Sequence, residues 1–525
     1  MKSFCRNFLF FIMIITTGAV NGQHTGILNP YFVYPDTVAK PLKAAALSLF
    51  PDALIYSINR ATKKDFAFIN GQTITSNFMF TALWDNDMFG TNLLSHPFHG
   101  SLDYGGARVS GMNYWQAIPY TFTASLIWEL VLENEPMSYN DQIATSFGGP
   151  ILGEASYRIS SSIIKNEAKG FERVAREIFG ALTCPMNGID RLLTGQMWRV
   201  KRSSKNLEYF SDNLKNYYKS SFNKNLYHNQ YCAPKTRINN DLSSNEIGYK
   251  YINIQANVEL SYRHVWEEYP NKEKISSPYI TINYIYGNPF DTYKLRPFDY
   301  FRFKFGLNLK KNDNLLNFLD VTGLLWGKEI EEDYVGTNAM WGIFQHFRYK
   351  DTEGNMSDYV PSWRYSEPAS VGIGLITDSR IPWHNFSFEG YFNLVFLAAA
   401  PATNFNLKGR QYNYGQGYSL NMYLDYNFKN RVNIGLENYM MQFFTWIGYD
   451  SSLKIDEQDF RKLRAMGDKG NTVLFNIRPY INLYLFNNFS LHFNYSLFNQ
   501  YTFNKNYKNL SSSFHDYNIG LRFNF

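Results

Sequence analysis

The chain has 525 residues, 18% of them aromatic, a formal net charge of +6 and a mean hydropathy of −0.35. The length allows two domains, and the scattered Lys and Arg residues form no basic stripe, which excludes nucleic acid as an expected partner. Aromatic residues at this level beside many polar ones are unusual in soluble domains and typical of outer-membrane barrels.

The N-terminus has the features of a secretory signal peptide. Lys2 and Arg6 give a positively charged start, the segment 8–15 is apolar, and small residues lead to an expected cleavage site after Gly22. We therefore predict a signal peptide over residues 1–22. Cys184 and Cys232 remain in the mature chain, which is compatible with one disulfide or with two thiols.

Residues 23–200 are expected to form a helical domain. Apolar residues recur at helical spacing over 41–58, and Pro51 is expected to break or kink that helix. A second helix is expected directly after His96, because Pro97 favours a first helical position and keeps the preceding residue out of the helix. Small residues along this helix, beginning at Gly100, predict that another helix packs closely against it.

Further helices follow in the same region. The mostly apolar stretch 114–135 places Ser125, Glu129 and Glu133 on one helical face, because they are spaced by four residues. Ser138 is expected to cap the next helix. Glycines from Gly148 onward predict another closely packed helix, and 171–182 predicts one more. Residues 201–245 are rich in Lys, Asn and Ser and are interpreted as a linker or large loop.

From about residue 245 the pattern changes to a period of two, which predicts β-strands. The alternating runs lie at 252–262, 280–286, 301–309, 315–326, 340–349, 370–376, 386–397, 418–428, 432–443, 473–485, 491–503 and 517–525. Most are about ten residues long, enough to cross a bilayer at a tilt. We predict a β-barrel membrane protein with an N-terminal α-helical domain. Its antiparallel transmembrane barrel has about twelve strands over residues 246–525, and the helices plug or flank the lumen.

The last run ends on an aromatic residue, Phe525. A terminal strand of this kind is typical of Gram-negative outer-membrane barrels, whose assembly machinery reads it. We therefore predict localisation in the cell outer membrane, with outer-membrane lipid and the barrel assembly machinery as partners. A small-molecule ligand, if there is one, is not identified by the sequence.

Residues 77–160 carry the spaced motifs WDND, HP..G...Y..AR..G, S..WE...E, S..D and G....GE. Together they resemble an uncharacterised outer-membrane family with domain of unknown function 3943. The matched positions are Trp84, Asp85, Asp87, His96, Pro97, Gly100, Tyr104, Ala107, Arg108, Gly111, Ser125, Trp128, Glu129, Glu133, Ser138, Asp141, Gly148, Gly153 and Glu154. The family has no assigned activity, so the resemblance transfers no catalytic residue.

Five polar residues are candidates for chemistry: His96, His99, Ser125, Glu129 and Glu154. The two histidines could bind a metal ion with nearby carboxylates, but they lack a strong metal-binding spacing, so a structural role is favoured and neither a metal nor a cofactor is predicted. Ser125 could form a hydrolase triad with a histidine and Asp141. No G-x-S-x-G motif surrounds it, and helical serines usually bond to the backbone.

Glu129 lies within an apolar helix, where a carboxylate is costly unless it is paired or protonated. Arg108 is its expected partner, with His96 or His99 second. Structural or ligand-binding roles are expected for Trp84, Asp85, Asp87, Tyr104, Arg108, Trp128, Glu133 and Asp141. We predict a channel or binding protein that its helical domain gates or plugs. The alternative is an enzyme acting on envelope lipid or glycan through a His/Glu site in the helical domain.

Overall fold

The computed structural model describes residues 31–33, 39–79, 82–85, 87–200, 249–251, 254–269, 274–290, 297–310, 315–330, 337–351, 363–381, 384–401, 412–429, 431–448, 465–486 and 488–524. The predicted signal peptide, the whole segment 201–245 with Cys232, and Phe525 lie outside these residues. The chain divides into two compact units, one of residues 1–37, 156–255 and 525, the other of residues 38–155 and 256–524.

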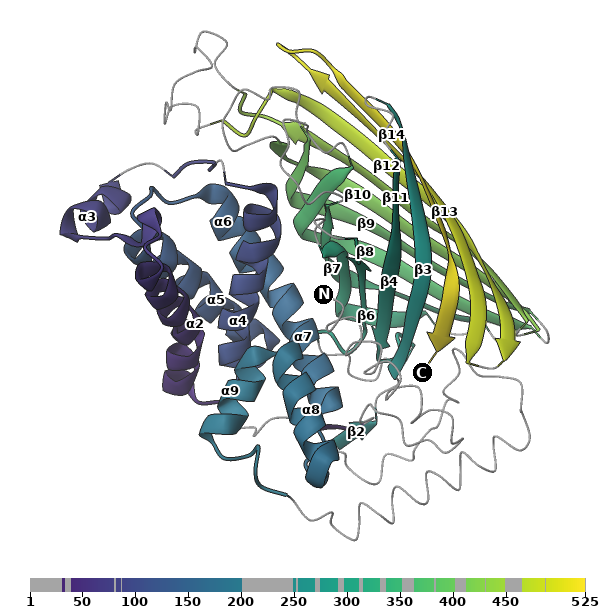
Figure 1. Ribbon diagram of the computed structural model, residues 1–525, viewed down its shortest axis with the longest axis horizontal. Helices are drawn as coiled ribbons and strands as arrows, with labels where there is room; N and C mark the ends of the chain where they lie inside the picture. The colour runs from purple at the N-terminus through teal and green to yellow at the C-terminus, as the bar shows by residue number, and fades with distance from the viewer. Residues whose placement is uncertain are drawn as a thin grey trace. The chain divides into compact units, whose positions relative to one another are not determined.

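Twelve antiparallel strands close into a barrel in the larger unit (Figure 1). They are β3 Ile254–Tyr269, β4 Lys274–Tyr286, β5 Phe301–Asn308, β6 Leu316–Ile330, β7 Thr337–Asp351, β8 Arg364–Ile381, β9 His384–Pro401, β10 Tyr412–Phe428, β11 Val432–Thr445, β12 Gly470–Phe486, β13 Phe489–Asn504 and β14 Leu510–Asn524. Each strand pairs with its neighbours in sequence, and β14 pairs with β3 to close the sheet. This confirms the barrel and its predicted strand number.

Side chains that meet across the barrel identify the lumen face of each strand. Arg302 of β5 donates to Glu389 of β9 at 2.7 Å, and Arg348 of β7 donates to Asn421 of β10 at 2.8 Å. These strands are not neighbours in the sheet, so the side chains reach each other through the lumen. Alternate residues of a strand point to opposite faces. The residues directly before and after these lumen-facing side chains in each strand therefore point outward.

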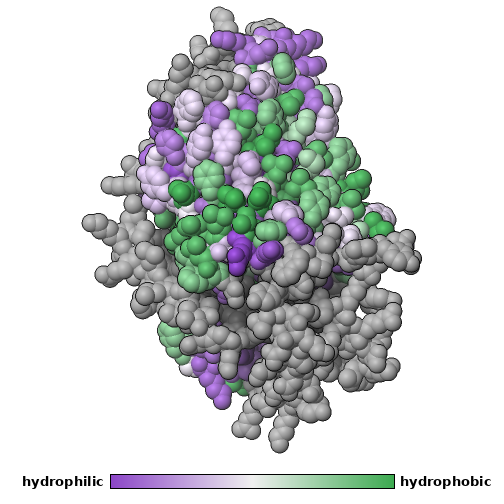
Figure 2. Space-filling view, turned by 90° about the vertical axis from the view of Figure 1, so that its right-hand side faces the viewer, coloured by the Kyte–Doolittle hydropathy of each residue, from purple (hydrophilic) through white to green (hydrophobic). Residues whose placement is uncertain are grey.

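The outward positions are apolar and exposed. Large examples from several strands are Tyr262, Trp326, Trp341, Ile373, Phe392, Leu394, Ile434, Phe493 and Ile519. Figure 2 shows apolar residues gathered over one face of the molecule. A closed sheet pairs its backbone groups within itself and presents apolar side chains to lipid, so this barrel is built to span a membrane.

The larger unit also contains the helices that precede the barrel. They are α2 Pro41–Ala61, the 3-10 turn η1 Asp65–Ala67, α3 Gly71–Met79, the π-helical turn η2 Thr91–Ser95, α4 His96–Val109, α5 Tyr114–Ile127, the π-helical turn η3 Trp128–Leu132, α6 Tyr139–Ile143, the π-helical turn η4 Ala144–Gly148 and the first half of α7 Gly149–Ile163. Among the described residues, no helix is both long enough and apolar enough to cross a bilayer.

The smaller unit holds the second half of α7 with α8 Gly170–Thr183, α9 Pro185–Leu193, and a two-stranded sheet of β1 Tyr31–Val33 and β2 Tyr249–Tyr251. A buried ion pair between Arg191 and Glu177, at 2.7 Å, joins α9 to α8. Ser160 Oγ donates to the Gly180 carbonyl at 2.7 Å and fixes α7 against α8. The sequence predicted a helix at 171–182, which α8 confirms, but it missed the small sheet.

The expected break at Pro51 is absent, because the helix α2 continues through this residue. The prediction for the backbone of His96 was wrong. His96 has helical dihedral angles, φ −63° and ψ −48°, and begins α4, although Pro97 follows it. The π-helical turn η2 precedes His96 directly, and a widened turn gives the proline ring more room next to the preceding carbonyl groups. His96 and His99 therefore lie on one continuous helix, three residues apart.

Close helix packing at the small residues is confirmed. A Cβ atom on Gly106 would lie 2.3 Å from the Leu47 carbonyl oxygen of α2, and one on Gly100 would lie 2.4 Å from the Thr145 carbonyl oxygen. Pro51 has no N–H to donate to the Leu47 carbonyl four residues earlier. The gap in the α2 hydrogen-bond ladder therefore lies where α4 approaches most closely.

Candidate functional site

The lumen of the barrel is occupied by paired charges. Lys304 lies 2.8 Å from Glu437, and Arg478 lies 3.2 Å from the same carboxylate. Arg263 lies 3.0 Å from Asp516. A cavity of about 100 Å³ lies among these groups. Side-chain exposures of 19% for Lys304 and 26% for Glu437 indicate that this charged section is open to water.

Beside the charged section, apolar side chains fill the lumen. Twelve buried residues form one cluster, here called the lumen cluster: Val265, Trp363, Tyr365, Val395, Ala398, Ala400, Tyr439, Met441, Phe443, Leu474, Phe498 and Phe514. The Phe498 ring stacks on the rings of Trp363 and Tyr365, with centroids 5.6 and 5.5 Å apart. The members of the lumen cluster come from seven strands, β3, β8, β9, β11, β12, β13 and β14, and meet inside the barrel.

The helices of the larger unit contact the outward face of β7 to β10. Asn92 donates to the hydroxyl oxygens of Tyr412 and Tyr414, at 2.9 and 2.6 Å. The ring of Phe147 lies 5.7 Å from that of Phe396, which points outward beside the inward Val395. These contacts favour the flanking alternative of the sequence analysis over the plugging one.

Three of the predicted residues belong to this contact. The Trp84 ring lies 5.3 Å from the Tyr414 ring, and Asp85 accepts a hydrogen bond from Asn92. The backbone carbonyl of Asp87 accepts from the Tyr412 hydroxyl at 2.8 Å. Trp84, Asp85 and Asp87 of the WDND motif therefore hold the helices to the barrel wall, which is the structural one of the two roles expected for them.

Arg108 pairs with Glu154, so the expected pair with Glu129 was wrong. The guanidinium holds the carboxylate through Nε at 2.6 Å and Nη2 at 3.1 Å, and the Tyr104 hydroxyl donates to it at 2.8 Å. Glu154 lies on α7 and the other two residues lie on α4, and all three are buried. This ion pair joins α4 to α7, so Glu154 has a structural role.

Glu129 instead converges with His96 and Asp141. Each of the three has one possible metal-ligand atom within 4.8 Å of those of the other two, and His96 Nε2 is 3.5 Å from Asp141 Oδ1. Glu129 Oε2 accepts the Ser138 N–H at 2.9 Å. Burial raises the pKa of Glu129 to about 8 and lowers the pKa of His96 to about 4. Burial therefore favours the protonated carboxyl of Glu129 and the neutral imidazole of His96, a pair of groups suited to proton exchange.

The serine triad that was considered as an alternative is not assembled. Ser125 Oγ lies 3.4 Å from Gln142 Oε1, and no histidine nitrogen in the described part of the chain lies within hydrogen-bond distance of it. Ser138 is at the N-cap position of α6, but its hydroxyl donates to Asn140 Oδ1 and accepts no helix N–H. The backbone carbonyl oxygen of Glu133 accepts a hydrogen bond from the Asn77 side chain at 2.8 Å.

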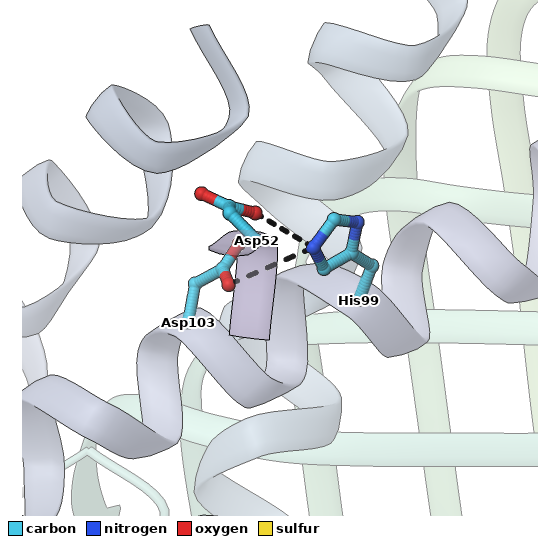
Figure 3. A group of neighbouring side chains, drawn as sticks. All are labelled: Asp52, His99 and Asp103. Carbon is cyan, nitrogen blue, oxygen red and sulfur yellow. Dashed lines mark ion pairs between the residues drawn. The ribbon is translucent and has the colours of Figure 1, made fainter. Parts of the chain in front are cut away.

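His99 lies in a second group, with Asp52 and Asp103, which the sequence analysis did not single out (Figure 3). His99 Nε2 is 2.7 Å from Asp52 Oδ1 and 4.0 Å from Asp103 Oδ1. The Trp128 ring packs edge-on against the imidazole, with centroids 4.9 Å apart. Asp103 follows His99 by one helical turn, a spacing that could have indicated it. Asp52 lies on α2, and only the fold brings it to α4.

The family model of domain of unknown function DUF3943 matches residues 81–186, which confirms the resemblance predicted from the motifs. Among curated proteins, no sequence matches this chain.

The solved structures similar to this chain include outer-membrane proteins. OmpT of Vibrio cholerae is 7% identical over 52% of this chain and 97% of its own, with a TM-score of 0.22. The outer-membrane channel DcaP of Acinetobacter baumannii is 8% identical over 52% and 97%, also with a TM-score of 0.22. Similarities this weak carry no argument about function. The closed barrel and its apolar outer face place this chain in the outer membrane, as predicted.

Proposed function

We propose that the protein is a gated outer-membrane channel, closed in this structure by the lumen cluster. The observation that carries the proposal is the division of the lumen into a charged section, which holds a cavity of about 100 Å³, and an apolar section beside it. Buried ion pairs are weak evidence for stability, because desolvation offsets their attraction. Their retention in a partly wet lumen therefore supports a role in passing or selecting ions.

The apolar section has the chemistry of a gate. An apolar constriction excludes water and ions until its side chains move apart. Trp363, which stacks on Phe498 and lies 5.4 Å from the Phe514 ring, directly precedes β8. Movement at that end of β8 would take Trp363 out of the lumen cluster and widen the path.

The helices bind the outward face of the strands that lie nearest Trp363. Arg364, the first residue of β8, lies over the Phe89 ring at 5.0 Å. Phe89 also packs edge-on against Tyr412, at 5.2 Å between centroids. A shift of the helices would therefore act on the chain next to Trp363. This supports gating by a module that flanks the barrel rather than plugs it.

The test is conductance in planar bilayers. We expect the wild-type protein to conduct rarely, and a variant with Trp363→Ala, Phe498→Ala and Phe514→Ala to conduct steadily because the lumen cluster is emptied. Phe493→Ala is the matched control, since this side chain is on β13 but points outward and is exposed. A folded triple variant that conducts no more than wild type would contradict the channel.

The group of His96, Glu129 and Asp141 favours a second candidate, an enzyme acting on envelope lipid or glycan. A neutral imidazole beside a protonated carboxyl is suited to general acid–base catalysis, and the helices that hold it bind the lipid-facing surface of the barrel. The test is product release from vesicles of outer-membrane lipid. Loss of release in His96→Gln, with release retained in His264→Gln, would support the enzyme. Equal rates with and without the protein would exclude it.

A further inference from the structure

The group of Asp52, His99 and Asp103 is used neither by the proposed channel nor by the second candidate. One donor atom from each of the three lies within 4.8 Å of the others. The group is formed by two helices, because Asp52 comes from α2 and the other two residues from α4. Figure 3 shows the two carboxylates and the imidazole turned toward one another.

These groups are buried without the hydrogen bonds that buried polar atoms normally have. Asp52 is 1% exposed and Asp103 is fully buried. His99 Nε2 and Asp52 Oδ1 form a close ion pair at 2.7 Å. Apart from this contact, none of the four carboxylate oxygens accepts a hydrogen bond from the described residues.

We propose that Asp52, His99 and Asp103 bind a divalent transition-metal ion of the Zn²⁺ class. An imidazole nitrogen with carboxylate oxygens suits Zn²⁺ and its neighbours better than Mg²⁺ or Ca²⁺, which prefer oxygen alone. Two carboxylates would neutralise the charge of the ion. With bonds of about 2.0–2.2 Å, donors of one ion lie up to about 4.4 Å apart, so small side-chain rotations would complete the site.

The backbone holds these donors in place before any ion binds. Ser48 Oγ donates to the carbonyl of Asp103 at 2.7 Å, and Gly106 allows α2 to approach α4 closely. Ser48 is one turn before Asp52, so the same contact that joins the helices brings the carboxylates together. Burial also raises the pKa of both aspartates, which marks the energetic penalty that a bound cation would remove.

The neighbouring group of His96, Glu129 and Asp141 is a weaker candidate for a metal. Glu129 already accepts the Ser138 N–H at 2.9 Å, and Asp141 Oδ1 accepts from Asn140 at 2.8 Å. Its carboxylates are held by protein donors, whereas those of Asp52 and Asp103 are not. The proposal is therefore limited to the site around His99.

The experiment is Zn²⁺ binding to the full-length protein in detergent after treatment with a chelator. We expect one bound ion per chain beyond any bound by the double variant Asp52→Asn, Asp103→Asn. Removing two ligands should weaken affinity about 100-fold or more. Asp65→Asn is the matched control, because this aspartate is exposed on a nearby turn, and it should bind like wild type.

X-ray absorption of the zinc-loaded wild type keeps the test valid if the double variant does not fold. We expect a first shell of nitrogen and oxygen with imidazole scattering, and loss of that imidazole signal in His99→Gln but not in His264→Gln. Absence of a stoichiometric ion in the wild type would overturn the proposal. Unchanged affinity in a folded double variant, or equal competition by Mg²⁺, would overturn it too.

Discussion

The lumen of the barrel and the core of the helices both bury charged side chains, but they balance the charge differently. In the lumen each cation named here lies beside an acid: the half-buried Lys304 and Arg478 share Glu437, and the buried Arg263 holds Asp516. In the helices of residues 39–155, Arg108 is matched by Glu154, while four further buried acids gather beside two histidines: Asp52, Asp103, Glu129 and Asp141.

This difference indicates two kinds of function. A lumen with compensated charges is stable as built and can change conductance only when its walls move. A helical core with surplus acids must take up protons or a cation to be stable. The barrel is therefore the part where we expect gating, and the helical core is the part where we expect ligand binding. The following variants test whether that division is correct.

The largest effect is expected in the lumen. Arg263→Met would leave Asp516 buried without its guanidinium and should lower the free energy of unfolding by about 3–5 kcal/mol. Urea unfolding of the detergent-solubilised barrel measures it. Lys328→Met, at an exposed strand position, should change little. A stability loss no larger than that of the control would mean that the lumen does not depend on paired charge.

Glu154→Gln tests the compensated pair of the helical core. The neutral amide leaves the buried Arg108 charge unmatched, and we expect a loss of about 3 kcal/mol in the free energy of unfolding. The control Glu172→Gln changes a carboxylate whose side chain is 53% exposed. Adding Arg108→Met to Glu154→Gln should recover part of the stability. If the double variant is less stable than Glu154→Gln alone, the loss does not come from an uncompensated charge.

Gly106→Ala tests whether close helix approach builds the core. The new methyl group would lie 2.3 Å from the Leu47 carbonyl oxygen, and such overpacking should destabilise the fold by about 1–3 kcal/mol. Gly71→Ala is the control, because nothing lies within 4 Å of a Cβ atom there. Equal melting temperatures for the two variants would show that α2 does not depend on this contact.

The smallest effect is expected where the two regions meet. Asn92→Ala removes the hydrogen bonds to Tyr412 and Tyr414 and should cost about 1 kcal/mol. Limited proteolysis measures it, since helices held less tightly should be cut faster while the barrel stays resistant. Gln72→Ala, at an exposed position of α3, should leave the cutting rate unchanged. Slower cutting of the Asn92 variant would contradict the proposed attachment.

The strands could be predicted from the sequence, whereas their contacts could not. Lipid on one side and a polar lumen on the other force the side chains of each strand to alternate, so runs such as 301–309 are visible in the sequence alone. The partners within the lumen depend on barrel closure. Lys304 and Glu437 are 133 residues apart in sequence and meet only because β5 faces β11.

The helical site was predicted only in part, for a similar reason. The family motifs identified His96, Glu129 and Asp141, which converge, and Arg108 and Glu154, which pair. They did not reveal which acid pairs with Arg108, because that depends on how the helices that carry Arg108, Glu129 and Glu154 pack together. Asp52 carries no local signal in α2, and the helical backbone of His96 depends on the widened turn before it.

The position of the helices on the outward face of the barrel is tested most directly by cross-linking. In a chain with Cys184 and Cys232 replaced by serine, a short bifunctional thiol-reactive reagent such as a bis-maleimide should join Phe147→Cys to Phe396→Cys, whose native rings are 5.7 Å apart. It should not join Phe147→Cys to Val395→Cys, because residue 395 points into the lumen. Cross-linking at residue 395 and not at residue 396 would place the helices inside the barrel and contradict the account.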